Sequence, residues 1–428
     1  MWSTMEAWGR LVRGSVAGAF DRGVRPGVGT RARSRGRALG HPSRELLLEA
    51  FGAPLRAWLE GAGTARFRHD QIKRWYLRGA TSFATMTDLP LSLRERLAAT
   101  FDLRASRVVR HVADPDGTEK LLLEWPDGGR TESVLLREGE RRTVCLSSQI
   151  GCAMGCVFCA SGIGGVERDL TREEIIEQAI RLVECLPEGE RLSHIVMMGM
   201  GEPLANLDAV LPALEFLTDR HGLGISRRRV TISTVGLPHG IRRLAAEAPG
   251  YHLAISLHAA VDRLRTELVP VNRSLGIDLI LGAADEYFER TGRRLTFEYV
   301  LLAGVNDDPA AARQLARRMR GRAALINLIP YNEVAGLGFR RPAPAAVRAF
   351  RSVLEREGLT VQVRRRKGGR IEAACGQLRH ESSTRIAEGK QDARRGGRKP
   401  GGAEKTESES GGAGSDETLC REIGVESL

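Results

Sequence analysis

The chain has 428 residues, 42% of them hydrophobic, and a formal net charge of +12. This length accommodates one large domain with a full-sized core and a smaller domain beside it. No apolar stretch approaches the length of a membrane span, so we expect no membrane partner. The seven cysteines form an odd set, which differs from a disulfide-stapled secreted protein and indicates a reducing, cytoplasmic compartment.

The two ends of the chain differ in composition from the rest. Residues 1–43 are rich in Arg and Gly and show no hydrophobic period. This composition is compatible with a targeting presequence or an upstream start codon, but we expect a disordered extension. Residues 381–428 change from a basic run to an acidic run rich in Gly and Ser, a composition that cannot bury a core. We therefore expect a second disordered tail there.

Residues 44–105 predict a small N-terminal helical domain. One apolar-periodic stretch begins near residue 44, and another covers residues 82–101. Between them, the segment Lys73-Arg74-Trp75-Tyr76 places basic groups next to aromatic rings, a pairing suited to RNA phosphates and stacked bases. The alternative is that these aromatic side chains are core residues of a helical bundle. The pattern alone leaves both interpretations open.

Residues 106–380 predict strands and then an alternation of strands and helices. A hairpin is expected at residues 120–125 and 133–137. The clearest helix begins with a capping-box pattern at Thr171. Six further β-type runs are separated by helical segments, at residues 144–148, 194–200, 230–234, 252–257, 295–302 and 323–329. This alternation predicts an α/β fold with a partial (β/α)6 barrel, whose active site lies where the strands end.

Three cysteines after the first of these runs form a C-x3-C-x2-C loop: Cys152, Cys156 and Cys159. Three thiolates can hold three irons of a [4Fe-4S] cluster and leave the fourth iron open. A zinc site would need a fourth local ligand, and the loop offers none before His194. Three buried structural thiols are the other alternative. The spacing favours the cluster.

A cluster loop directly after the first strand of a β/α repeat resembles the radical S-adenosylmethionine (SAM) superfamily. Further segments, in order and at matching spacing over residues 45–380, resemble the dual-specificity rRNA/tRNA adenine-C2 methyltransferase family, RlmN. The segments that carry this resemblance are CLSSQIGC at 145–152, MMGMGEPL at 197–204, SLH at 256–258, INLIPYN at 326–332 and AACGQL at 373–378.

The resemblance implies methylation of adenine C2 in 23S rRNA, at the peptidyl-transferase centre, and in tRNA at position 37, with two SAM molecules consumed per turnover. Cys375 would accept a methyl group from the first SAM and become S-methylcysteine. A radical from the second SAM, bound to the open iron, would take a hydrogen atom from that methyl group, and the carbon radical would add to C2. Glu132 would accept the C2 proton. Cys145 would attack the Cys375 sulfur, releasing the RNA and leaving a disulfide.

The resemblance also implies the SAM contacts and the partners. A carboxylate at the end of the second strand, Glu202, can bind the ammonium group of SAM. Taken alone, His258 would more often be a packed histidine than a ligand. The expected partners are 23S rRNA, tRNA and a reducing partner such as a flavodoxin-type electron donor, and the protein is expected to be a monomer. The implied SAM contacts are Gly201, Glu202, Ser233, Ser256, Leu257, His258 and Asn332.

Without the resemblance, the catalytic candidates would have ordinary interpretations. An isolated cysteine such as Cys375 is usually a buried structural residue. Its place beside a glycine and after the basic run at residues 364–370 favours instead a mobile loop near an RNA backbone. Cys145 would be a core strand residue, and Glu132 a solvated carboxylate at the start of a strand. Their joint action requires that Cys145 and Cys375 can approach disulfide distance.

Two basic runs, residues 227–229 and 364–370, are candidates for holding the phosphates that flank an unstacked base, although such runs are usually solvated surface. Arg370 stands where the RlmN family commonly has an acid. Two other functions remain open. One is Cfr-type methylation at C8 of the same rRNA adenosine, and the other is a non-catalytic, zinc-containing RNA-binding module.

Overall fold

The computed structural model describes residues 44–378, which belong to one compact unit that begins at Arg44. The predicted tails lie outside the described residues. The first part is helical, as expected, and a short parallel pair of strands, β1 and β2, joins its two ends. Its elements are β1 (Glu45–Leu46), α2 (Leu47–Ala50), α3 (Ala53–Gly61), α4 (Arg68–Leu77), the 3-10 helix η1 (Phe83–Thr85), α5 (Leu91–Thr100) and β2 (Phe101–Asp102).

The basic and aromatic segment on α4 is largely a packing element. Tyr76 is fully buried. Lys73 is buried too, and its Nζ lies 2.8 Å from Asp219 Oδ2 and 4.5 Å from the centre of the Phe216 ring. Trp75 is half-buried, and its indole N–H donates to Asp88. The core interpretation therefore holds for Lys73 and Tyr76, because neither is accessible to a nucleic acid.

A ten-stranded mixed sheet forms the rest of the fold, in the order β14-β13-β12-β11-β10-β9-β6-β5-β4-β3. The pairs from β3 to β6 are antiparallel, and all pairs from β6 to β14 are parallel. Its strands are β3 (Arg107–Ala113), β4 (Glu119–Glu124), β5 (Arg130–Glu138), β6 (Arg141–Cys145), β9 (His194–Met197), β10 (Val230–Thr234), β11 (His252–Ser256), β12 (Leu295–Leu301), β13 (Ala324–Pro330) and β14 (Thr360–Val363).

The predicted hairpin is β4 and β5, and the six predicted β-type runs appear as β6 and β9 to β13. The sequence missed β14, the seventh parallel strand, and the edge strand β3. Both are only partly buried along their length, so neither carries the hydrophobic run that marks a central strand. The sheet has free edges at β3 and β14, consistent with a partial barrel.

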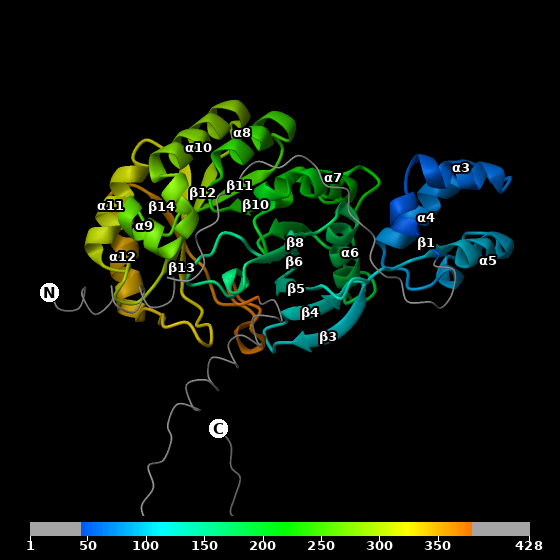
Figure 1. Cartoon of the computed structure of the whole chain (residues 1–428), viewed down its shortest axis with the longest axis horizontal. Coiled ribbons are helices and arrows are strands. Elements are labelled where there is room, and N and C mark those ends of the chain that lie inside the picture. The colour runs from blue at the N-terminus through cyan, green and yellow to red at the C-terminus, as the bar shows by residue number, and fades with distance from the viewer. Residues whose placement is uncertain (1–43, 379–428) are drawn as a thin grey trace, which may run out of the picture. The chain divides into compact units, whose positions relative to one another are not determined.

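The helices of the alternating part form an arc around the parallel strands (Figure 1). The capping box at Thr171 is present: its hydroxyl accepts from Glu174 N, and the Glu174 carboxylate accepts from Thr171 N. Within the described residues, no helix combines the length and the apolar character needed to cross a membrane. The main helices are α6 (Arg172–Val183), α7 (Leu207–Thr218), α8 (Pro238–Glu247), α9 (Asp262–Leu268), α10 (Ile277–Thr291), α11 (Pro309–Met319) and α12 (Pro344–Arg356).

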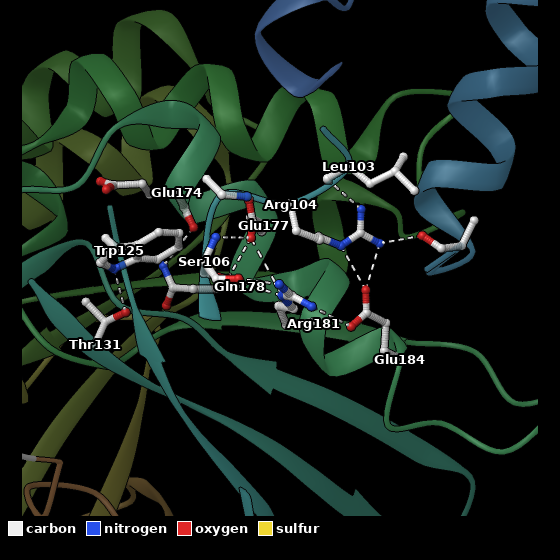
Figure 2. Close-up of polar contacts among 12 residues, drawn as sticks. Leu103, Arg104, Ser106, Trp125, Thr131, Glu174, Glu177, Gln178, Arg181 and Glu184 are labelled. Carbon is white, nitrogen blue, oxygen red and sulfur yellow. Dashed lines mark hydrogen bonds and ion pairs between the residues drawn. The ribbon is translucent and has the colours of Figure 1, made fainter. Parts of the chain in front are cut away.

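Residues 103–106, which lead out of the helical part, are fastened to α6 by paired polar groups (Figure 2). We call this contact the α6 junction. The Glu177 carboxylate, completely buried, accepts from Ala105 N (2.9 Å), from Ser106 N (2.8 Å) and from the Ser106 hydroxyl (2.6 Å). Arg104 pairs with Glu184 at 2.7 Å. The helical part is thus tied to the same helix that follows the cysteine loop.

Candidate active site

A cavity at the carboxyl ends of the parallel strands collects most of the predicted site residues. In this fold class, active sites lie at the carboxyl ends of the parallel strands. Three predicted site residues do not line this cavity: Leu257, Cys145 and Glu132. The predicted residues that do are Cys152, Cys156, Cys159, Gly201, Glu202, Ser233, Ser256, His258, Asn332 and Cys375.

The cysteine loop connects the two strands of a short hairpin, β7 (Gln149–Gly151) and β8 (Val166–Asp169). Gly151 has φ +76°, and a Cβ there would lie 2.1 Å from the Gly165 carbonyl oxygen. Only glycine therefore fits where the chain enters the loop. Cys152 N donates to the same Gly165 carbonyl at 2.9 Å, which fixes the start of the loop.

The three loop thiols line the same cavity. Burial raises the pKa of Cys152 to about 12 and also raises the pKa values of Cys156 and Cys159. The neighbouring thiols raise the pKa of Cys156 further. A thiol in such surroundings stays protonated unless a metal replaces the proton.

The three loop sulfurs are not gathered as closely as the ligands of a single zinc ion. In residues 44–378, one group of three Cys, His, Asp or Glu ligands has all its ligand atoms within 4.8 Å of one another, and it is not the cysteine loop. Tetrahedral zinc at about 2.3 Å from each sulfur requires sulfurs closer than that limit. The group that meets it, His111, Glu119 and Cys185, already has a cation, because Arg137 pairs with Glu119 and donates to the Cys185 carbonyl.

The segment after β9 is pressed against the backbone that precedes the cysteine loop. A Cβ at Gly199 would lie 2.7 Å from Leu146 O, and one at Gly201 would lie 2.7 Å from Gln149 N. The buried Glu202 carboxyl accepts from Leu204 N (3.0 Å) and Val235 N (2.8 Å). Burial raises the pKa of Glu202 to about 7. A positive ligand group would be favoured beside it.

The next strand ends supply hydroxyl and imidazole groups. Ser233 on β10 and Ser256 on β11 have their oxygens 3.5 Å apart. His258 is buried with φ +62°, and its Nδ1 accepts from Val300 N at 3.1 Å. Burial lowers the pKa of His258 to about 3, so the ring is neutral and carries its proton on Nε2. Its edge packs against Phe158 of the cysteine loop, with ring centres 4.9 Å apart.

Leu257 reaches this region through its backbone. Its side chain is fully buried in the main core. Its N–H donates to Glu298 O at 3.0 Å, and its carbonyl accepts from the buried Arg265 at 3.0 Å. The structure therefore places Leu257 as a support of the strand end, while its neighbours Ser256 and His258 line the cavity.

Cys145 and Cys375 are 230 positions apart in the sequence, yet they are near enough for the charge of Cys375 to affect Cys145. Cys145 ends β6 and is buried, and burial followed by the charge of the nearby Cys375 raises its pKa to about 12. Cys375 is half-buried and lines the cavity. Both thiols are free in the structure.

Residues 368–378, which we call the Cys375 loop, are hydrogen-bonded to the cysteine loop. Ala160 N donates to Gly376 O at 2.8 Å, and the Ser161 hydroxyl donates to Leu378 O at 2.7 Å. From the other side, Asn332 Nδ2 donates to Cys375 O at 3.3 Å. Asn332 therefore lies at the cavity and also holds the backbone of the catalytic candidate.

Glu132 is not a solvated carboxylate. It lies on β5, it is 8% exposed, and its carboxylate is 2.8 Å from Lys120 Nζ. The Ser147 hydroxyl donates to its carbonyl at 2.7 Å, which links β5 to the segment between Cys145 and the cysteine loop. The ordinary interpretation of Glu132 from the sequence is therefore wrong.

Two cavity residues were missed from the sequence. Glu298, on β12, is buried and accepts from Asn327 Nδ2 at 2.8 Å. Arg364 belongs to the basic run that is favoured, of the two, as the RNA contact, yet its side chain lines the cavity, and the negative charge of Cys375 raises its pKa. Arg364 directly follows β14, so recognising that strand would have placed it at a strand end. In the same run, Lys367 donates to the Asp116 and Arg137 carbonyls.

Comparisons with known families and proteins cover most of the described residues. The sequence model of the radical SAM superfamily matches residues 146–316. The model of the ribosomal RNA large subunit methyltransferase N-terminal domain matches residues 47–103.

Close relatives share this arrangement over most of their length. A probable dual-specificity RNA methyltransferase RlmN of Rhodopirellula baltica is 56% identical over 79% of this chain and 91% of that protein. A dual-specificity RNA methyltransferase RlmN of Syntrophobacter fumaroxidans is 43% identical over 76% of this chain and 95% of that protein. The crystal structure of a radical SAM methyltransferase from Sphaerobacter thermophilus has a TM-score of 0.73 and 42% identity, and covers 78% of this chain and 99% of that structure.

Proposed function

The chain belongs to the RlmN family of radical SAM RNA methyltransferases, and we propose that it methylates C2 of adenine in 23S rRNA and in tRNA. Family membership makes it an enzyme, which removes the non-catalytic zinc module from consideration. The observation that carries the finer proposal is the electrostatic proximity of Cys145 to Cys375, which lines the same cavity as the three-cysteine loop.

The family implies a [4Fe-4S] cluster and SAM, and the cavity fits both. Cys152, Cys156 and Cys159 would hold the cluster. Glu202, with Gly201 beside it, would receive the amino group of SAM, and Ser233, Ser256, His258 and Asn332 would surround the rest. When bound, this pair supplies a carbon radical that can take a hydrogen atom from a methyl group.

Cys375 would act first as the methyl acceptor. Its thiolate would attack the methyl carbon of SAM, the carbon–sulfonium bond would break, and S-methylcysteine would remain on the protein. Arg364 lies in the same cavity and interacts electrostatically with Cys375. After hydrogen abstraction, the carbon on the Cys375 sulfur would add to C2 of the base.

Glu132 and Cys145 would complete the reaction. The adduct must lose one electron, which the oxidised cluster would take up, and the C2 proton, which Glu132 would accept. Cys145 would then give up its thiol proton and attack the Cys375 sulfur, breaking the bond of that sulfur to the methylene carbon and forming a disulfide. The methylene carbon takes up a proton and leaves as the methyl group of the RNA. Reduction of the disulfide would return both free thiols.

The helical part, residues 44–105, would serve as an RNA-binding accessory domain of the enzyme formed by residues 106–380. In the two basic runs, the exposed arginines that could contact phosphates are Arg227, Arg228, Arg229, Arg365, Arg366 and Arg370. A flavodoxin-type donor would supply electrons, and the protein would work as a monomer.

The test is methylation of a 23S rRNA fragment and a tRNA by the anaerobically reconstituted protein, followed by nucleoside mass spectrometry. We expect 2-methyladenosine from both RNAs. The appearance of 8-methyladenosine would identify a Cfr-type enzyme and overturn the C2 assignment. Product from one RNA alone would remove the dual specificity and leave the chemistry in place.

A further inference from the structure

Lys120 occupies an unusual place for a lysine. Its side chain and that of Glu132 are each 11% exposed, and the distance between Lys120 Nζ and Glu132 Oε1 is 2.8 Å. Lys120 Nζ also lies 3.2 Å from the carbonyl oxygen of Glu372, three residues before Cys375. One ammonium group thus joins the candidate proton acceptor to the loop that carries the candidate methyl acceptor.

Strand register puts these groups on one face of the sheet. Lys120 on β4 is paired with Val134 on β5, and Val134 is paired with Cys145 on β6. Directly paired residues share a face, and so do residues two apart on one strand, which includes Glu132. The Cys375 loop covers this face, because Cys145 and Val134 pack against Ala373.

The Cys375 loop is held in a costly conformation at the point that Lys120 contacts. Glu372 has φ +52°, a left-handed conformation that non-glycine residues rarely adopt. The preceding turn is fixed to the β3–β4 hairpin, since Gly368 N donates to Asp116 Oδ2 at 2.9 Å and Arg370 N donates to Asp114 Oδ2 at 2.9 Å. Ala373 N then closes the turn on Gly368 O. The carbonyl at Glu372 is therefore presented to Lys120 by a turn that needs outside support.

We propose that Lys120 is a positioning residue that fixes Glu132 and the Cys375 loop relative to each other. This inference rests on the proposed function of both partners. A lysine suits the role because its ammonium carries three donors, enough for a carboxylate and a carbonyl together. With Lys120 in place, one ammonium group holds both the Glu132 carboxylate and the Glu372 carbonyl of the Cys375 loop. Without it, the carboxylate and the loop each lose this contact.

The first test is amide hydrogen exchange of the reconstituted full-length protein. In Lys120→Met, the amides of residues 372–376 should exchange at least about tenfold faster than in the wild type, since one contact worth about 1.4 kcal/mol is removed. Lys73→Met is the matched control, because it breaks another buried lysine pair, with Asp219. It should leave exchange in the loop unchanged. Equal loop exchange in Lys120→Met and the wild type would overturn the proposal.

The second test separates the steps of the reaction. In a single turnover, Lys120→Met should still form S-methylcysteine and the RNA adduct, but it should resolve the adduct at least about tenfold more slowly. Lys120→Arg should recover part of that rate because it restores the ion pair. If Lys120→Met resolves the adduct at the normal rate while Glu132→Gln resolves it slowly, the proposed role of Lys120 is wrong and that of Glu132 stands. Normal resolution in Glu132→Gln would defeat the proposed role of Glu132 itself.

Lys120→Met removes the positive partner of a buried carboxylate and can prevent folding. If Lys120→Met does not fold, the double variant Lys120→Met/Glu132→Gln, which removes both charges, is used for the exchange test. Loop exchange as slow as in the wild type in the double variant would contradict the contact between Lys120 and Glu372.

Discussion

The α6 junction and the cavity both bury ionisable groups, but these groups have different kinds of partner in the two places. At the junction, the completely buried Glu177 accepts three hydrogen bonds and lies 3.6 Å from Arg181, and Arg104 is paired with Glu184. In the cavity, Glu202 is hydrogen-bonded to two backbone amides and to the Thr234 side chain, His258 accepts from Val300 N, and burial displaces the pKa values of both.

The difference separates a structural contact from a reactive one. Paired charges fix one segment against another and are already satisfied. Buried ionisable groups that have displaced pKa values and no partner of opposite charge are typical of binding and catalytic sites. We therefore expect changes at the cavity to alter chemistry with little effect on folding, and changes at the junction to do the reverse.

The largest effect on chemistry should come from Cys375→Ala. Without the acceptor sulfur there is no S-methylcysteine, so RNA methylation should fall below detection. Iron content and the visible absorption of the cluster should match the wild type, because the three loop cysteines remain. Iron analysis and a methylation assay on the same preparation check both statements. Residual methylation would place the methyl acceptor elsewhere.

At the junction, Glu177→Gln should destabilise the protein by about 3 kcal/mol, because an amide cannot accept all the hydrogen bonds that Glu177 receives. Denaturant unfolding followed by circular dichroism measures this change. Glu173→Gln, on the same helix, removes a partly exposed pair with Arg172 and should cost at most about 0.5 kcal/mol. Similar losses in the two variants would show that the junction does not depend on the buried carboxylate.

The cavity should also differ from the junction in a smaller effect, the dependence of the free energy of unfolding on pH. The folded-state pKa of His258 is lowered from 6.5 to about 3, so between these values the unfolded chain binds a proton that the folded chain excludes. Its contribution to stability is complete above pH 6.5 and is lost as the pH falls, at about 1.4 kcal/mol per unit. Asparagine tolerates positive φ and can accept from Val300 N, so we expect His258→Asn to fold.

The measurement is the free energy of unfolding of both proteins at pH 7 and pH 5. The wild type should lose up to about 2 kcal/mol more than His258→Asn over this range. Equal losses would mean that His258 is not buried in its neutral form.

Motif spacing was sufficient to predict the cavity side of the molecule. The three loop cysteines, Glu202 and His258 all lie where strands end, as the strand–helix alternation implied. Edge elements were harder, because β3 and β14 are half-exposed and lack a hydrophobic run. Because β14 is not recognisable from the sequence, Arg364 is predicted only as part of an RNA-contacting basic run and not as a residue at a strand end.

Pairings between distant segments could not be obtained from composition or period. The contact of Lys120 with Glu132 depends on the register of β4 and β5, and its contact with Glu372 spans 252 positions. The burial of Lys73 depends equally on the end of α7. Such contacts are set by tertiary packing, which a single sequence leaves open.

The central claim is that Cys145 and Cys375 act as a pair on RNA, and Cys145→Ala tests it most directly. Without the attacking thiol, the bond between the Cys375 sulfur and the methylene carbon should persist. Mass spectrometry of the anaerobic reaction should find RNA attached through a methylene bridge to the peptide that contains Cys375. Normal turnover of Cys145→Ala without any such adduct would contradict the account.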